Sequence, residues 1–281
     1  MTNSVKTVLL LGLLTGVLLF GGEALGGQNG LIMGLGLAVL MNFSSYYFSD
    51  KIALATYGAQ PVTPDQYPDV YRRVAPIVEN LARRMGLPMP KLYLIAEESP
   101  NAFATGRNPS HASVAFTEGI LRLMSDQELE GVVAHELGHV LHRDILISSV
   151  AATLAGAILF LSRMAFFFGG SRDDRDREGG GIGALLMLIL APIAAFLIQM
   201  AISRSREYDA DAASAKYTGT PYELISGLEK LDAWSKRLPM PATPSTAHLF
   251  IIKPRTGSFL QSLFSTHPST EDRIRRLQEM R

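Results

Sequence analysis

Four long stretches of this 281-residue chain contain no charged side chain, and they constrain its fold more than any other feature. They are 16, 19, 18 and 23 residues long and cover residues 7–22, 31–49, 145–162 and 181–203. A helix needs roughly 20 apolar residues to cross a bilayer core about 30 Å thick. The pattern therefore predicts an integral membrane protein and excludes a simple soluble globule, a collagen-like chain and a disordered chain.

The first two stretches predict a transmembrane hairpin over residues 1–50, joined by a loop of eight residues, 23–30. Tyr46 and Tyr47 would anchor it at the membrane interface. The loop carries no Lys or Arg, whereas Lys51 and several arginines follow the second stretch. Because positive charge stays inside, we expect the N-terminus and the region after residue 50 to face the cytoplasm. The alternative is a signal peptide at the N-terminus.

Residues 145–203 predict a second transmembrane hairpin, although the loop at residues 171–181 holds three arginines and four acids. A hydrophobic hairpin that packs on the domain or lies in the membrane surface is the alternative. Arg143 and Asp144 would mark the membrane boundary. Residues 51–144 read as a soluble cytoplasmic domain, and residues 204–281 as a cytoplasmic part that completes its site.

Local patterns in the polar regions predict a mainly α fold with a small β-sheet. A capping box, Ser125 with Glu128, opens a helix that runs to about Arg143. Strand-like composition covers residues 91–95, and residues 101–105 and 113–118 form a predicted β-hairpin. Further helices are expected over residues 68–87, 222–237 and 270–281.

Charge and cysteine content exclude several functions. The chain has 26 basic and 26 acidic residues, so it lacks the basic excess that a nucleic-acid partner requires. It has no cysteine, which excludes disulfides, a thiol nucleophile and a thiolate metal site. Any metal must be bound by carboxylates and by some of the six histidines.

The strongest motif is H-E-L-G-H, from His135 to His139. Residues four apart lie on one face of a helix, so both imidazoles can reach one metal ion. Glu136 lies one step round the helix, where it can act on a water at the metal but is poorly placed as a ligand. This arrangement is typical of a metalloprotease base with its two histidine ligands.

A zinc ion needs a third protein ligand, and Glu207 is the candidate. His139 lies six residues before the third apolar stretch, and Glu207 lies four residues after the fourth. At 1.5 Å per residue both are ~6–9 Å from the same membrane boundary, so antiparallel spans would return Glu207 to the histidines. Asp211, one turn further on, would accept a hydrogen bond from a ligand histidine and orient it.

Several blocks of the sequence resemble the HtpX family of membrane-bound zinc endopeptidases, which are relatives of the CAAX-processing membrane proteases. The resemblance covers nearly the whole chain. It implies a zincin-like fold with one zinc ion per subunit on His135, His139 and Glu207, and Glu136 as the base. The matching blocks are NAFATG (101–106), HELGHVLHRD (135–144), SREYDADA (205–212), TAHLFII (246–252) and STHPSTEDRI (265–274).

The resemblance implies two further parts of the site. His267 and Arg273 fit the family's terminal pattern and are candidate donors to the oxyanion of the tetrahedral intermediate. A strand edge would pair with the backbone of an extended substrate, which suits a protease that accepts many sequences. Its residues would be Asn101, Ala102, Phe103 and Ala104.

The resemblance also implies a role in membrane-protein quality control. The expected substrates are polypeptides, in particular misfolded or damaged membrane proteins, cleaved at the cytoplasmic face of the bacterial inner membrane. Two alternatives stay open. One is a processing peptidase with few substrates, and the other is a non-catalytic membrane adaptor whose zinc site is structural.

Overall fold

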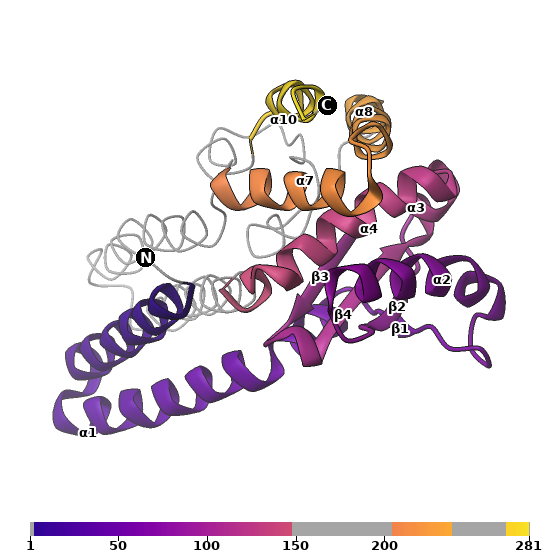
Figure 1. Ribbon diagram of the computed structural model, residues 1–281. Coiled ribbons are helices and arrows are strands. Elements are labelled where there is room, and N and C mark those ends of the chain that lie inside the picture. Colours follow the sequence, from indigo (N-terminus) through magenta and orange to yellow (C-terminus); the bar gives the residue numbers. More distant parts are fainter. Residues whose placement is uncertain (1–2, 148–203, 238–267, 281) are drawn as a thin grey trace.

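Helix α1 (Asn3–Thr56) doubles back on itself at Gly26 and Gly27, whose backbone angles are not helical (Figure 1). The computed structural model describes residues 3–147, 204–237 and 268–280. Gly27 has φ 55° and ψ −139°, a conformation that glycine adopts most readily. The expected eight-residue loop is therefore wrong, because the helix continues to this glycine pair and resumes directly after it.

The two arms of α1 pack through glycines. A Cβ atom at Gly22 would lie 2.2 Å from the Gly30 oxygen, and one at Gly34 would lie 2.4 Å from the Leu18 oxygen. Small residues of this kind let helices approach closely in membrane proteins. Asn42 Nδ2 donates a hydrogen bond to Thr15 Oγ1 (2.9 Å) and links the two arms near their middle.

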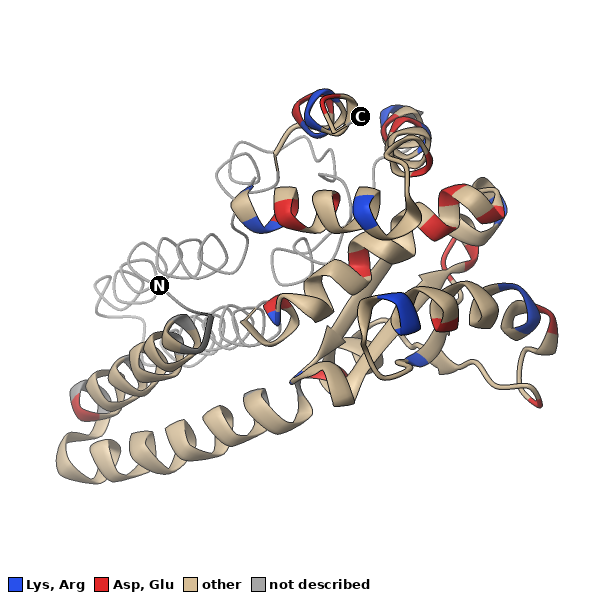
Figure 2. Ribbon diagram, viewed as in Figure 1, with Lys and Arg blue, Asp and Glu red and all other residues tan. Residues whose placement is uncertain are grey.

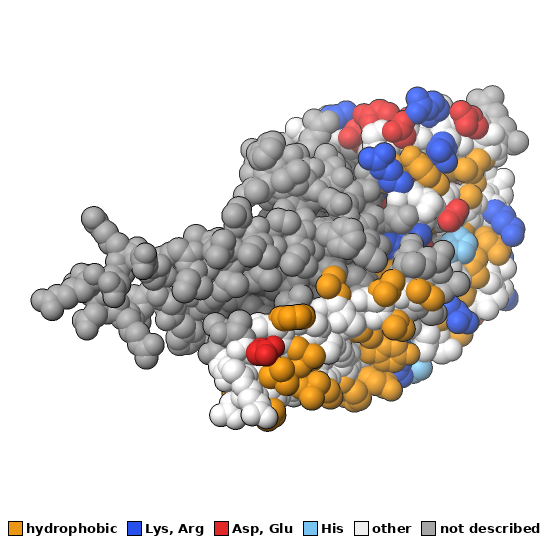
Figure 3. All heavy atoms as spheres, turned by 90° about the vertical axis from the view of Figure 1, so that its left-hand side faces the viewer, with side chains coloured by type: hydrophobic (Ala, Val, Ile, Leu, Met, Phe, Trp, Pro, Cys, Tyr) orange, Lys and Arg blue, Asp and Glu red, His pale blue; other side chains and the backbone are white. Residues whose placement is uncertain are grey.

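The outer surface of this hairpin is apolar. Phe20, Met33 and Phe43 are more than half exposed. The hairpin carries almost no charge in Figure 2, and hydrophobic side chains predominate on its described part in Figure 3. By length and composition, Gly26–Phe48 is the one helix among the described residues that is long and apolar enough to cross a membrane. The second predicted hairpin lies almost wholly outside the described residues, so it stays a prediction.

The sheet has four strands in the order β1-β2-β4-β3: β1 (Gln60–Pro61), β2 (Lys91–Ile95), β3 (Ala102–Gly106) and β4 (Ala112–Thr117). Antiparallel pairing of β3 with β4 confirms the predicted hairpin, whose turn contains a short 3₁₀ helix (Pro109–His111). The parallel pairing of β2 with β4 was not predicted. Strand β3 forms one edge of the sheet, and β1 forms the other.

Helix α4 (Asp126–Leu141) lies at the centre of the domain and contacts β3 and the helices α2, α7 and α8 (Figure 1). Its apolar side chains join a core that includes Phe116, Leu137 and Leu228. This mostly helical fold with a small mixed sheet agrees with the predicted class. The other helices are α2 (Pro68–Met85), α3 (Glu118–Leu123), α7 (Arg204–Thr218), α8 (Tyr222–Arg237) and α10 (Thr270–Gln278).

Candidate metal and active site

Helix α4 is fixed at its start by the predicted capping box. Glu128 accepts a hydrogen bond from the Ser125 backbone N–H (2.8 Å), and the Ser125 hydroxyl oxygen accepts one from the Glu128 N–H. The Glu128 carboxylate also accepts from Ser226 Oγ (2.6 Å) and Lys230 Nζ (2.7 Å) on α8. Burial alone would raise the pKa of Glu128, but these donors outweigh it and lower the pKa to about 2. The start of α4 is thereby tied to α8.

Two glycines let neighbouring helices approach α4 closely. A Cβ atom at Gly138 would lie 3.1 Å from the Ala210 Cα on α7, and one at Gly131 would lie 2.6 Å from the Leu224 nitrogen on α8. Ser214 Oγ on α7 donates a hydrogen bond to the Gly131 oxygen (2.7 Å). Because Gly138 has no side chain, α7 can approach the histidine face of α4, and Gly131 allows the same for α8.

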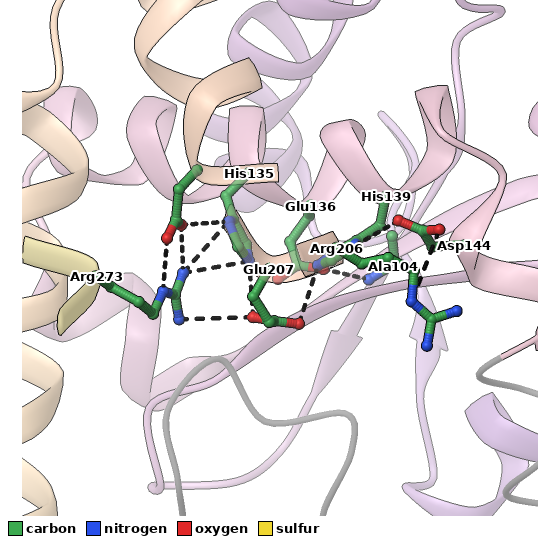
Figure 4. Close-up of polar contacts among 9 residues, drawn as sticks. Ala104, His135, Glu136, His139, Asp144, Arg206, Glu207 and Arg273 are labelled. Atoms are coloured by element: carbon green, nitrogen blue, oxygen red, sulfur yellow. Dashed lines mark hydrogen bonds and ion pairs between the residues drawn. The ribbon is translucent and has the colours of Figure 1, made fainter. Parts of the chain in front are cut away.

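His135, His139 and Glu207 come together at this contact (Figure 4). Nε2 of His135 lies 3.8 Å from Glu207 Oε2, and Nε2 of His139 lies 3.6 Å from Glu207 Oε1. Ligands of one zinc ion at about 2.1 Å can lie at most about 4.2 Å apart, so both pairs fit a shared ion. Among the described residues, these three side chains form the one group able to hold a metal.

His135 contacts a second carboxylate through its other ring nitrogen. Its Nδ1 lies 2.9 Å from Asp211 Oδ1, and Asp211 is held in turn by Arg273 of α10, which donates from Nε (2.9 Å) and Nη2 (2.6 Å). Burial would raise the pKa of Asp211, but the Arg273 guanidinium and His135 outweigh it and keep that pKa below its usual value. Arg273 Nη1 also lies 3.8 Å from Glu207 Oε2.

Glu136 points from α4 towards β3. Its Oε2 accepts a hydrogen bond from the Ala104 N–H (2.9 Å). The Asn101 oxygen accepts from the Thr117 N–H on the β4 side. Backbone groups of successive residues point to opposite sides of a strand, so the N–H and C=O groups of Ala102 and Ala104 point to the outer edge. Burial raises the pKa of Glu136, although His135, His139 and the Ala104 N–H act against this shift. A carboxylate with a raised pKa is suited to proton transfer near neutral pH.

His139 is paired with Asp144, and this contact with a candidate ligand histidine was not predicted from the sequence. Its Nδ1 lies 3.3 Å from Asp144 Oδ2, and the other oxygen of Asp144 lies 4.0 Å from Arg206 Nε. Burial alone would lower the pKa of His139. The carboxylates of Asp144, Glu207 and Glu136 outweigh burial and raise that pKa to about 9. Spacing alone gave no signal for this contact, because residues five apart do not share a helix face.

The buried charges of the described site also suit a divalent cation. With both histidines neutral, as metal ligands must be, four carboxylates face two guanidinium groups and leave two formal negative charges. All six side chains belong to residues no more than 7% exposed: Glu136, Asp144, Arg206, Glu207, Asp211 and Arg273.

Other histidines and the predicted substrate strand lie outside this ligand group or outside the described residues. His267 lies outside the described residues, so its role stays a prediction. His142 forms the C-terminal cap of α4 and is not in the metal-ligand group. Residues 101–104 lie at the start of the edge strand β3 as expected, but all four are buried: Asn101, Ala102, Phe103 and Ala104. Substrate binding by this strand stays a prediction.

Comparison with known proteins identifies the family. The model of Peptidase family M48 matches residues 68–281. A "Protease HtpX homolog" of Desulforapulum autotrophicum is 50% identical over 99% of this chain and 90% of its own length. Proteins of the same name from Persephonella marina and Syntrophobacter fumaroxidans are 53% and 51% identical and cover 99% and 100% of this chain, and 97% and 100% of their own.

A solved structure supports the fold independently. The crystal structure of S. mikatae Ste24p aligns with 98% of this chain at a TM-score of 0.53, with 19% sequence identity. The chain spans 65% of the length of that protein. The extent of the family match and the half-identical relatives show that this chain belongs to peptidase family M48, as a metalloprotease of the HtpX family.

Proposed function

We propose that the chain is a membrane-integrated zinc endopeptidase that cleaves misfolded or damaged membrane proteins on the cytoplasmic side of the bacterial inner membrane. The observation that carries this proposal is the convergence of His135, His139 and Glu207, with Glu136 beside them on α4. Three protein ligands leave one position open, as in catalytic zinc sites. A structural site usually fills four positions and needs no base, which argues against the adaptor alternative.

In this proposal His135, His139 and Glu207 bind the zinc ion. Bound zinc would supply Lewis acidity, polarising the scissile carbonyl and lowering the pKa of a water towards 7. Glu136 takes a proton from the attacking water, and the water oxygen bonds to the carbonyl carbon of the substrate. It then delivers the proton to the amide nitrogen as the carbon–nitrogen bond breaks. Its raised pKa suits both transfers.

Two further groups would act on the substrate. The outer edge of β3, from Asn101 to Ala104, is proposed to pair with an extended peptide, so that main-chain hydrogen bonds bind substrates of many sequences. The bond from Ala104 N–H to Glu136 supports this placement, because it puts that edge beside the base. Arg273 and His267 are proposed as donors to the oxyanion. In support of this role, Arg273 Nη1 lies 3.8 Å from Oε2 of Glu207, one of the three proposed metal ligands.

The apolar exterior of α1 supports a site close to lipid. His139 precedes the third apolar stretch by six residues, and Glu207 follows the fourth by four. Loops and cytoplasmic tails of membrane proteins would therefore lie within reach of the cleavage site. This argument favours membrane substrates over freely soluble ones.

The experiment uses full-length protein in detergent, with and without a chelator. Bound zinc is measured, and degradation of an unfolded membrane protein is compared with that of an unfolded soluble protein. We expect about one zinc ion per chain, chelator-sensitive degradation and faster cleavage of the membrane substrate. Glu136→Gln should keep its zinc and lose activity. The matched control is Glu130→Gln on the same helix, where Glu130 faces Arg84 (3.9 Å), and it should cleave normally.

Other results would point to the alternatives. Equal activity in wild type and Glu136→Gln would end the protease mechanism given above. Cleavage of one substrate at a single peptide bond would favour a site-specific processing peptidase. Bound zinc without cleavage of either substrate would favour an adaptor.

A further inference from the structure

Each of the two candidate histidine ligands has a carboxylate at its second nitrogen, and each carboxylate has an arginine. Asp211 contacts His135 Nδ1 and is held by Arg273, as described above. Asp144 contacts His139 in the same way, with 3.3 Å between Oδ2 of Asp144 and Nδ1 of His139. The other carboxylate oxygen of Asp144 faces Arg206. Figure 4 shows the two arrangements on opposite sides of Glu207.

The backbone makes a specific turn to bring Asp144 to this position. In a continuous helix, residue 144 would lie about 140° round the axis from residue 139. Helix α4 instead ends at Leu141, and Arg143 has φ 59°. Among the described residues, Tyr67 is the one other non-glycine with positive φ. Such a conformation costs on the order of 1 kcal/mol and persists only where the surroundings fix it.

Asp144 also links the two chain segments on either side of the apolar region 145–203. It directly precedes that region, whereas Arg206 lies on the first turn of α7 just after it. Both side chains are buried, at 3% and 7% exposure. Glu207 follows Arg206 directly, so a contact that fixes Arg206 also fixes the backbone from which Glu207 projects.

We infer that Asp144 is a positioning residue for the metal site. By accepting a hydrogen bond from Nδ1 of His139, it holds that ring in the tautomer whose Nε2 lone pair faces Glu207. Through Arg206, it holds the first turn of α7 in register with α4. This inference rests on the proposed function, because it concerns how tightly the three proposed ligands hold zinc.

The test measures zinc affinity in full-length protein in detergent, by competition with a coloured chelator. Every variant carries Glu136→Gln so that self-cleavage cannot interfere. Asp144→Ala should weaken zinc binding about 10–100-fold. Asp144→Asn keeps an acceptor for His139, so it should weaken binding between about twofold and tenfold. The matched control, Asp232→Ala, removes an ion pair with Lys236 within α8 and should leave affinity unchanged.

A second readout separates positioning from a merely structural role. The visible absorption of the Co²⁺-loaded protein reports ligand geometry, and we expect it to change in Asp144→Ala and to stay close to the parent in Asp144→Asn. Unchanged zinc affinity and an unchanged Co²⁺ spectrum in folded Asp144→Ala would overturn the inference. If that variant does not fold, parent-like affinity in both Asp144→Asn and Arg206→Gln would overturn it.

The same experiment separates this inference from the proposed function. If the Glu136→Gln parent binds no zinc, or binds it as tightly after Glu207→Ala, the proposed metal site is wrong and the inference falls with it. If the parent binds zinc through Glu207 but the Asp144 variants bind equally well, only the inference is wrong.

Discussion

At the scale of single residues, the site depends on how buried charges are paired. Arg273 is 1% exposed and holds the Asp211 carboxylate with two donors, Nε and Nη2. The planar guanidinium matches a carboxylate in a way that an ammonium group does not. Breaking such a buried pair typically costs about 3–5 kcal/mol, because a charge is left uncompensated.

We therefore expect Arg273→Lys to lower both kcat/KM and thermal stability, with a loss of at least about tenfold in kcat/KM. Asp211 would lose its two-point contact and orient His135 less well. Peptide cleavage and thermal unfolding, measured on the same preparations, check this expectation. Arg275→Lys is the control, since Arg275 is an exposed residue of α10 paired with Asp272. A fall in kcat with unchanged stability would instead indicate that Arg273 acts mainly on the oxyanion.

His267 offers a separate test at the same scale. If it donates to the oxyanion, His267→Ala should lower kcat about tenfold or more without loss of bound zinc. Zinc content and steady-state kinetics on the same sample decide the matter. Unchanged turnover would remove His267 from the mechanism.

At the scale of elements, the close packing of α4 against α7 and α8 controls the site, and three helical glycines test it. Replacing glycine by alanine gains up to about 1 kcal/mol of helix propensity where there is room. A Cβ atom at Gly227 would meet its nearest neighbour at 3.4 Å, an ordinary contact, whereas the distances are 3.1 Å at Gly138 and 2.6 Å at Gly131. The order of these distances predicts the order of the effects.

Gly227→Ala should be neutral or stabilising, Gly138→Ala should change stability little but weaken metal binding, and Gly131→Ala should destabilise by about 1–3 kcal/mol. The reason is that the new methyl at residue 138 displaces α7 and Glu207, whereas the one at residue 131 meets the backbone of α8. Thermal unfolding and zinc affinity in the Glu136→Gln background give the ranking. Loss of stability in Gly227→Ala equal to that in Gly131→Ala would contradict it.

The contact between α4 and α8 predicts a pH dependence of stability. The pKa of Glu128 is lowered to about 2 by Lys230, Ser226 and Ser125, against the effect of burial. A carboxyl with a lowered pKa stabilises the folded state fully above its ordinary pKa of about 4.5, and this contribution is lost as pH falls towards 2. The melting-temperature difference between wild type and Glu128→Gln should therefore be largest above pH 4.5 and shrink below it. A difference that stayed constant across this range would rule out the ionised carboxylate as its cause.

Local sequence patterns predicted the elements, but they could not predict the contacts between them. Three confirmed predictions depend only on neighbouring residues. They are the capping box at Ser125, the strand at residues 91–95 and the helix at residues 222–237. The turn at Gly26–Gly27 and the parallel pairing of β2 with β4 depend on packing between distant segments. Asp144 reaches His139 only because Arg143 leaves the helix, and no helical periodicity encodes that turn.

At the scale of the whole molecule, the metal site joins parts that are distant in the sequence. His135 and His139 lie on α4, whereas Glu207 lies on α7 beyond the apolar region 145–203. A ligand that binds only the folded state stabilises it by RT ln(1 + [L]/Kd), which is about 4.1 kcal/mol at a thousand times Kd. Zinc bound across this contact would therefore stabilise the arrangement of both segments.

Adding zinc to chelator-stripped Glu136→Gln protein in detergent should raise its melting temperature by several degrees, and the rise should grow with the logarithm of free zinc concentration. Glu207→Ala removes one of the three proposed ligands and should abolish most of this rise. Glu229→Ala, at an exposed position on α8, should preserve it. Because Glu207 is the one proposed ligand outside α4, a rise that survived in Glu207→Ala would mean that α4 binds zinc without α7. The ion would then not join the two segments.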